Sequence, residues 1–159
     1  MSDPSLHVVL FQPEIPANAG AIGRTCVALS AKLWLVRPLG FRTSDRHLRR
    51  AGLDYWQHLV WEVADDWDDL LRRLPDPERK PWLLSKSAGR PYPEARFQAG
   101  DVVVFGSETQ GLPPSLLAAY PNRCLRIPMR PQARSLNLSV CVGIVAYEAW
   151  RQCGGTWER

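Results

Sequence analysis

The sequence has neither a membrane-spanning apolar run nor a cysteine pattern typical of disulfides or zinc. Strongly apolar stretches such as 140–147 are far shorter than the roughly 20 residues that a membrane-spanning helix needs. No basic segment precedes the short apolar run near the N-terminus, so no secretory signal is recognised and we expect a cytoplasmic protein. No C-x-x-C pair occurs among the four cysteines, Cys26, Cys124, Cys141 and Cys153. We therefore predict no metal site and no disulfide.

Lysine is also scarce, and acidic residues are unevenly distributed. Only three of the 20 basic residues are lysines. The remaining 17 are arginines, whose planar guanidinium pairs with phosphate and stacks on bases better than an ammonium does. Residues 62–78 hold seven of the sixteen acids, which leaves 18 bases and nine acids, a net +9, in the rest of the chain. This cationic remainder favours a nucleic acid as the partner.

Short apolar runs alternate with helical patterns along the whole chain. The sequence predicts strands at 6–11, 32–36, 59–63, 82–85, 102–105 and 125–127. It predicts helices from Asn18 as N-cap to residue 30, over 45–52, from Asp65 or Asp66 to residue 74, after Pro113, and over 138–151. This order predicts an α/β fold in one domain, 1–159: a mostly parallel sheet with helices on both faces.

The last predicted helix is apolar on every side. A helix that packs on a sheet buries only one side, so the other side needs a cover. A second copy of the chain is the simplest cover and predicts a homodimer. Neighbouring helices of the same chain are the alternative.

Three segments with small or bent residues follow predicted strands, where α/β folds bind ligands. They are NAGAIGRT (18–25), FGSETQGLP (105–113) and IPMRPQARSLNLS (127–139). Neither known nucleotide-binding loop fits, because no G-x-G-x-x-G occurs and Leu112 stands where a P-loop needs lysine. Taken singly, the glycines could form turns, the asparagines could cap helices and Glu108 could pair with an arginine.

Their combination and order resemble the SPOUT superfamily of RNA ribose 2'-O-methyltransferases. The matching patterns are N-x-G-x-x-x-R (18–24), V-F-G-x-E-x-x-G-L-P (104–113) and I-P-M followed by S-L-N-L-S (127–139). Three further segments, FQPEIPANAG (11–20), RRAGLDY (49–55) and YEAWRQ (147–152), resemble the small single-domain branch that methylates the wobble ribose, position 34, of tRNA. The resemblance covers about residues 6–153.

The resemblance implies a deep trefoil knot at the C-terminal part of the fold, a homodimer, and S-adenosylmethionine as the methyl donor. It places the donor in the knot, without a metal, against backbone groups of Leu83, Gly106, Ile127 and Leu136 and beside Ser135. It assigns the reaction to Arg24, Asn18, Glu108, Ser135 and Asn137.

Within that set, Arg24 is expected to stabilise charge. The superfamily assigns its arginine to activating the hydroxyl, but a guanidinium stays protonated at neutral pH and is a poor base. We therefore expect Arg24 to hold the neighbouring phosphate and stabilise the developing alkoxide, with Glu108 orienting either Arg24 or its own loop.

Arginines in the 46–50 segment predict an RNA contact. Arg46, Arg49 and Arg50 share one face of a short helix that Gly52 would end, and Arg37 and Arg42 flank it. Together with Lys86 they predict a surface for the anticodon loop of tRNA. Solvated charges with no partner are the alternative for these residues. For the whole protein, the alternatives are methylation of another tRNA or rRNA site, or a non-catalytic knotted RNA-binding protein.

Overall fold

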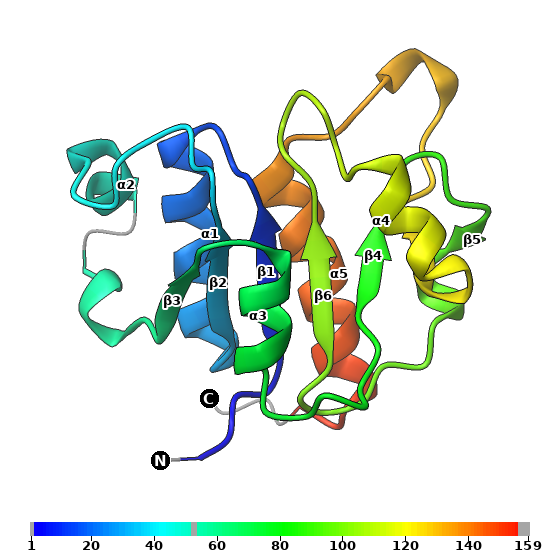
Figure 1. Cartoon of the computed structure of the whole chain (residues 1–159), viewed down its shortest axis with the longest axis horizontal. Coiled ribbons are helices and arrows are strands. Elements are labelled where there is room, and N and C mark those ends of the chain that lie inside the picture. The colour runs from blue at the N-terminus through cyan, green and yellow to red at the C-terminus, as the bar shows by residue number, and fades with distance from the viewer. Residues whose placement is uncertain (1, 52–53, 156–159) are drawn as a thin grey trace.

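The computed structural model describes residues 2–51 and 54–155, and its centre is one parallel sheet (Figure 1). The strand order is β3-β2-β1-β6-β4-β7-β5. The strands are β1 (His7–Phe11), β2 (Lys32–Val36), β3 (Trp61–Ala64), β4 (Trp82–Leu84), β5 (Arg90–Pro91), β6 (Val102–Phe105) and β7 (Cys124–Arg126). The predicted parallel sheet is confirmed. Strand β5 was not predicted, because a two-residue strand that includes a proline has no sequence signal.

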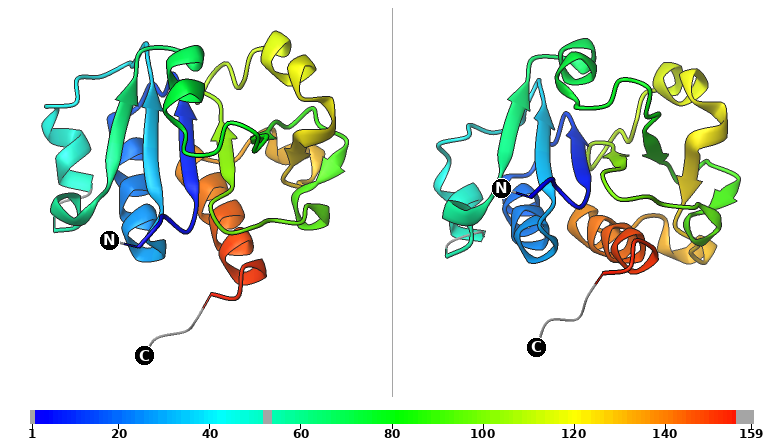
Figure 2. Two further views of the ribbon diagram at one scale, coloured as in Figure 1. Left: turned by 60° about the horizontal axis from the view of Figure 1, so that its bottom comes forward. Right: turned by 90° about the horizontal axis from the view of Figure 1, so that it is seen from below.

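Helices cover both faces of this sheet, as predicted (Figure 2). Two of them, α1 and α5, lie side by side on one face, and α3 and α4 lie on the other. The helices are α1 (Pro16–Leu29), α2 (Arg46–Ala51), α3 (Trp67–Arg73), α4 (Pro114–Ala119) and α5 (Leu138–Gln152). In the described part of the chain, no helix combines the length and the apolar character that a membrane span requires.

The two-residue period of the strands divides the core into two layers. Val8 and Leu10 of β1 pack with Ile22 of α1 and Val145 of α5. Val9, between them, belongs to the second layer with α3 and α4. Strands apolar on both faces are what a sheet covered on both sides requires.

The predicted cap at Asp66 is confirmed, the cap that was the alternative for Asn137 is also present, and the predicted cap at Asn18 is wrong. Asp66 accepts the Asp69 N–H at 2.7 Å and begins α3, and Asn137 accepts the Ser139 N–H at 2.8 Å and begins α5. Asn18 does not cap α1, because that helix begins two residues earlier, at Pro16. Proline suits the first helical position, where no N–H is needed.

The chain returns to the middle of the sheet after its last long loop. It leaves β7 near one side of the sheet, and α5 then packs on α1 and β6 (Figure 1). The carboxyl ends of β4, β6 and β7 therefore meet the loop that leads into α5. Threading of α5 through a knot stays a prediction. Gly52, expected to end the arginine-rich helix, lies outside the described residues.

Candidate active site

A cavity of about 550 Å³ opens at the carboxyl ends of the central strands. This volume is typical of a small-molecule site. The cavity brings together all three segments singled out in the sequence, although they lie up to 119 residues apart. Of the predicted site residues, the following line it: Asn18, Lys86, Gly106, Glu108, Ile127, Ser135, Leu136 and Asn137.

Gly106 closes the turn that forms one wall of the cavity. A Cβ at this position would lie 2.1 Å from the carbonyl carbon of Gly111 and 2.3 Å from the Leu112 nitrogen. The Gly111 N–H donates to the Ser107 carbonyl at 3.0 Å, and Gly111 has a φ of +65°. Only glycine allows the two backbone segments of this turn to approach each other so closely.

Glu108 connects the second segment to the first. Its carboxylate accepts the Glu14 N–H at 2.7 Å, the Ile15 N–H at 3.1 Å and the Asn18 side-chain amide at 3.3 Å. Within one chain Glu108 therefore holds the loops together, which is one of the two roles expected for it, and orientation of Arg24 stays a prediction. Its first two bonds hold the backbone just before α1.

Asn18 extends this connection to the third segment. The Asn137 side-chain amide donates to Asn18 Oδ1 at 3.1 Å, and Asn18 is buried. Glu108, Asn18 and Asn137 thus form one hydrogen-bonded chain across the three segments. Such a chain preorganises a site, because each member fixes the orientation of the next.

A second contact joins the Glu108 loop to the segment before α1, and here the carboxylate belongs to Glu14. The Thr109 hydroxyl donates to Glu14 Oε1 at 2.5 Å, and the Thr109 N–H does so at 3.4 Å. The Thr109 hydroxyl bond favours the charged carboxylate and lowers the pKa of Glu14 below its ordinary value. Glu14 and Glu108 thus each bind the loop that carries the other, which fixes this edge of the cavity.

Arg24 lies outside the cavity that the same chain forms. It is six residues after Asn18 on α1, which is about 9 Å along the helix and about a third of a turn around it. Its exposed guanidinium contacts Tyr55: Arg24 Nη2 donates to the tyrosine hydroxyl at 3.4 Å, and the guanidinium carbon is 4.6 Å from the ring centroid. The structure therefore brings together four of the five predicted catalytic residues and leaves Arg24 apart.

Leu83 does not line the cavity, and the predicted contact of its backbone with the donor stays a prediction. It is fully buried in the core layer of α3 and α4, whereas Leu84 and Ser85 line the cavity. Adjacent strand residues face opposite sides, so a displacement of one residue changes the face. The sequence reasoning also missed Ser107 and Thr109, whose position just after a buried strand was the available signal.

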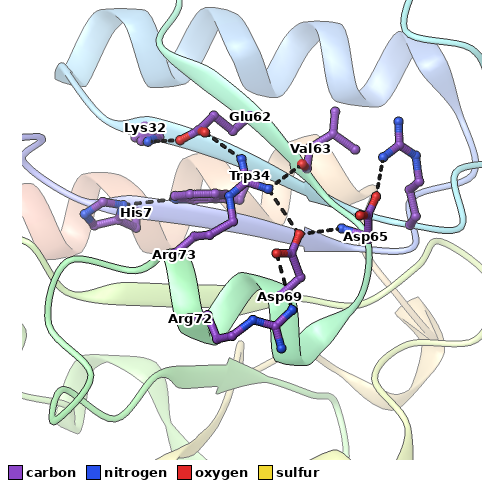
Figure 3. Close-up of polar contacts among 10 residues, drawn as sticks. His7, Lys32, Trp34, Glu62, Val63, Asp65, Asp69, Arg72 and Arg73 are labelled. Carbon is purple, nitrogen blue, oxygen red and sulfur yellow. Dashed lines mark hydrogen bonds and ion pairs between the residues drawn. The ribbon is translucent and has the colours of Figure 1, made fainter.

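Acidic side chains of the 62–78 segment are paired with nearby bases (Figure 3). Glu62 binds Lys32 and also Arg73, the latter at 2.6 Å, and Asp65 binds Arg37 at 2.8 Å. Arg37, which was expected to flank the arginine patch, is thus paired with Asp65 at the surface, and its contact with RNA stays a prediction. These acids neutralise Lys32 of β2, Arg37 just after β2 and Arg73 of α3.

Beneath this network, His7 is buried against Trp34, whose indole N–H donates to His7 Nδ1 at 3.1 Å (Figure 3). Burial, with the nearby charges of Lys32 and Arg79, lowers the pKa of His7 to about 4. A neutral imidazole is the form that accepts the indole proton, so His7 serves packing.

The arginines of α2 remain available for a partner. Arg46, Arg49 and Arg50 are exposed, and within residues 2–51 and 54–155 none of them forms an ion pair. Leu48, between them, is fully buried and packs the helix onto the core. The structure thus places three unpaired guanidinium groups on a helix anchored by one apolar residue.

Comparisons with known proteins identify the family of this chain. The profile of the SpoU rRNA Methylase family matches residues 5–147. The chain is 48% identical over 150 residues to the tRNA (cytidine(34)-2'-O)-methyltransferase of Burkholderia cenocepacia, which covers 93% of this chain and 96% of that protein. A solved structure described as an insight into 2-OH methylation of C/U34 on tRNA has a TM-score of 0.90 and 47% identity, over 95% of this chain and 97% of the other.

A third comparison concerns the methyl donor. The AdoMet-bound rRNA methyltransferase from Sinorhizobium meliloti has a TM-score of 0.81 and 26% identity, over 94% of this chain and 57% of that one. The fold and the three-segment cavity define an RNA methyltransferase class. The chain belongs to the SpoU rRNA Methylase family.

Proposed function

We propose that this protein transfers a methyl group from S-adenosylmethionine to the ribose 2'-hydroxyl of the wobble nucleotide, position 34, in tRNA. One observation carries the proposal: the three distant segments that resemble the methyltransferase motifs converge on one cavity. Relatives of nearly the same length carry out this reaction on C34 or C/U34 of tRNA. We propose further that the chain acts as one domain, in the cytoplasm where tRNA is modified.

The cavity fits the methyl donor by its shape and chemistry. The loop of residues 105–112 lines the cavity, and its main-chain N–H and C=O groups can read an adenine. Ile127, Leu136 and Leu84 supply apolar contacts, and Ser135 supplies a hydroxyl. S-adenosylmethionine, when bound, supplies a methyl group on a sulfonium. In the described ranges, no group of three His, Cys, Asp or Glu side chains could hold a metal ion.

Arg24 carries the charge stabilisation in this proposal. The ribose hydroxyl loses its proton as it attacks, so negative charge develops on its oxygen. A fixed guanidinium nearby stabilises this charge. Arg24 also binds the adjoining phosphate, and the proton leaves through a phosphate oxygen or water. Asn18, Glu108 and Asn137 keep the loops in register, while Ser135 helps to orient the ribose and donor.

A homodimer completes the site in this proposal. Arg24 lies outside the cavity of its own chain, so a second copy can bring its Arg24 to that cavity. Exposed apolar side chains mark the contact surface: Ile15 at the cavity rim is 43% exposed, and Val140 and Tyr147 on α5 are 49% and 42% exposed. Gly143 lies between the latter two with open space at its Cβ position, which favours close approach of a helix.

Substitution Gly143→Glu tests the dimer. The side chain meets open space in the single chain, so folding is retained, but a charge in the contact surface is expected to shift the protein to monomers and lower methyl transfer at least tenfold. Analytical ultracentrifugation and a methylation assay measure both effects. Gly89→Glu, also with open space at the Cβ position, is the matched control and should stay dimeric and active. A dimeric, active Gly143→Glu protein would contradict the proposed surface.

Substitution of Arg49 and Arg50 by alanine tests the RNA surface. We expect tRNA affinity to fall several-fold and the slope of log K against log salt to decrease by about one for each phosphate that the variant no longer binds. Arg72→Ala is the control, because Arg72 is paired with Asp69 on α3. Filter binding at several salt concentrations gives both quantities. Unchanged tRNA affinity would contradict the RNA contact and favour the alternative, in which the α2 arginines are solvated charges with no partner.

The reaction itself is tested by incubation of the purified protein with labelled S-adenosylmethionine and total tRNA, followed by mapping of the labelled nucleotide. We expect label on the ribose of nucleotide 34. Label at another position, or label in rRNA alone, would keep the chemistry and reject the target. Donor binding without any transfer would favour the non-catalytic alternative.

A further inference from the structure

Tyr55 ends the RRAGLDY segment and has no role in the site as described so far. It is 38% exposed and lies just after the arginine-rich helix α2. Its hydroxyl accepts from Arg24 Nη2 at 3.4 Å, and its ring centroid is 4.6 Å from the guanidinium carbon. In the part of the chain that the structure describes, this tyrosine is the side chain that holds the Arg24 guanidinium.

The backbone of Tyr55 is held firmly against α1. The 3-10 turn that follows it, η1 (Trp56–His58), packs on Gly23, where a Cβ would lie 3.0 Å from Leu59 Cδ2 and 3.3 Å from the Trp56 ring. A Cβ at this position would press on both side chains, so glycine favours the close packing of the turn on α1. Tyr55 is thereby carried next to Arg24, the neighbour of Gly23.

Contacts behind the turn fix it from the other side. The Trp56 ring lies 5.0 Å from the Trp61 ring of β3, measured between centroids, and the His58 N–H donates to the Tyr55 carbonyl at 2.9 Å. Tyr55 is therefore attached directly to a well-packed turn.

An exposed arginine benefits from such a support. A free arginine side chain samples many rotamers, and ordering it in the transition state opposes the reaction. The electron-rich face of the tyrosine ring attracts the Arg24 guanidinium, and the tyrosine hydroxyl accepts from one of the five N–H donors of Arg24. The remaining donors stay available for a phosphate and for the developing alkoxide.

We propose that Tyr55 is a positioning residue for methyl transfer, which holds Arg24 in the orientation that receives the ribose and its phosphate. This inference rests on the proposed function, because it gives Tyr55 a role only through Arg24. The tyrosine ring contributes most to holding Arg24, since the hydrogen bond to the hydroxyl is long, at 3.4 Å.

Three substitutions test the proposal. Tyr55→Leu removes ring and hydroxyl and should lower kcat about fivefold to tenfold, with nearly unchanged KM for tRNA and unchanged affinity for S-adenosylmethionine. Tyr55→Phe keeps the ring and should retain at least half of the kcat. Tyr55→Trp keeps a stronger cation-binding ring and should restore most of the loss seen with leucine. Tyr120→Leu is the control, because Tyr120 packs on Trp67 of α3, on the opposite face of the sheet.

A double substitution separates Tyr55 from Arg24. In an Arg24→Lys background, Tyr55→Leu should have a smaller effect on kcat than in the native protein, because the two residues act through one contact. Full additivity would overturn the proposal, as would a kcat for Tyr55→Leu equal to that of the native protein. A loss confined to tRNA affinity would also overturn it and make Tyr55 a stacking partner for a base.

Failure of the proposed function gives a different result. If Arg24→Ala retains its activity, the role of Arg24 is rejected and Tyr55 loses its role with it. If Arg24→Ala is inactive while Tyr55→Leu is fully active, only the positioning role of Tyr55 is rejected. Circular dichroism melting of each variant shows whether the turn on Gly23 still folds, and Tyr55→Phe keeps the test valid if the leucine variant is unstable.

Discussion

Replacement of Arg24 by alanine is expected to lower the rate of methyl transfer by about 10²- to 10³-fold. The guanidinium is the charge that the proposal aims at the developing alkoxide, and alanine removes it without filling or opening the cavity. Because the proposal directs the Arg24 guanidinium to the ribose oxygen and its phosphate and not to the methyl donor, affinity for S-adenosylmethionine should not change. Single-turnover kinetics and calorimetric titration with the donor measure the two quantities separately.

The matched control for this prediction is Arg123→Ala. Arg123 also places its guanidinium over an aromatic ring, 4.1 Å from the centroid of Trp82, but it lies at the start of β7, away from the cavity. Its loss should leave the rate within about twofold, as for a substitution outside the site. An Arg24→Ala protein that keeps more than a tenth of the native rate would remove Arg24 from the mechanism.

Replacement of Gly106 by alanine has the second large expected effect. The new Cβ would lie 2.1 Å from a backbone carbon of Gly111, so the turn must open. We expect the free energy of unfolding to fall by about 2 to 4 kcal/mol and affinity for the donor to fall at least tenfold. Denaturant melts and calorimetric titration check both.

Gly89 provides the control for Gly106. It has no heavy atom within 4 Å of its Cβ position, so Gly89→Ala should change the free energy of unfolding by less than about 0.5 kcal/mol. If Gly106→Ala binds the donor as the native protein does, the turn is not the wall of the donor site.

Three segments of the site could be located from the order of amino acids. Small residues and prolines after apolar runs predicted loops at the ends of strands, and parallel strands place those ends at one edge. The family resemblance then assigned Asn18, Glu108 and Asn137 to the reaction, and these three residues form one hydrogen-bonded chain. The sheet followed for a similar reason, since runs of Val, Leu and Phe apolar on both sides occur in strands that are covered on both faces.

Other features depended on distances that local patterns do not contain. The helix cap predicted for Asn18 was wrong because Pro16 begins α1, which leaves the Asn18 amide to bind Glu108 at 3.3 Å. The side chain of Leu83 packs in the core layer of α3 and α4, whereas Leu84 lines the cavity, because adjacent residues of a strand face opposite sides of the sheet. The bonds between Glu108 and the backbone of Glu14 and Ile15 cross more than 90 residues and have no periodic signal.

The linear pattern of residues was sufficient for the class of fold, the cationic character and the three segments that carry the chemistry, because periodicity, charge and turn preference are local properties. Folding alone decided that Glu108 holds the loops, that Arg24 points to Tyr55 and away from its own cavity, and that apolar side chains of α5 stay uncovered. These outcomes depend on how the elements pack against each other, and packing is set by the shape of the whole chain.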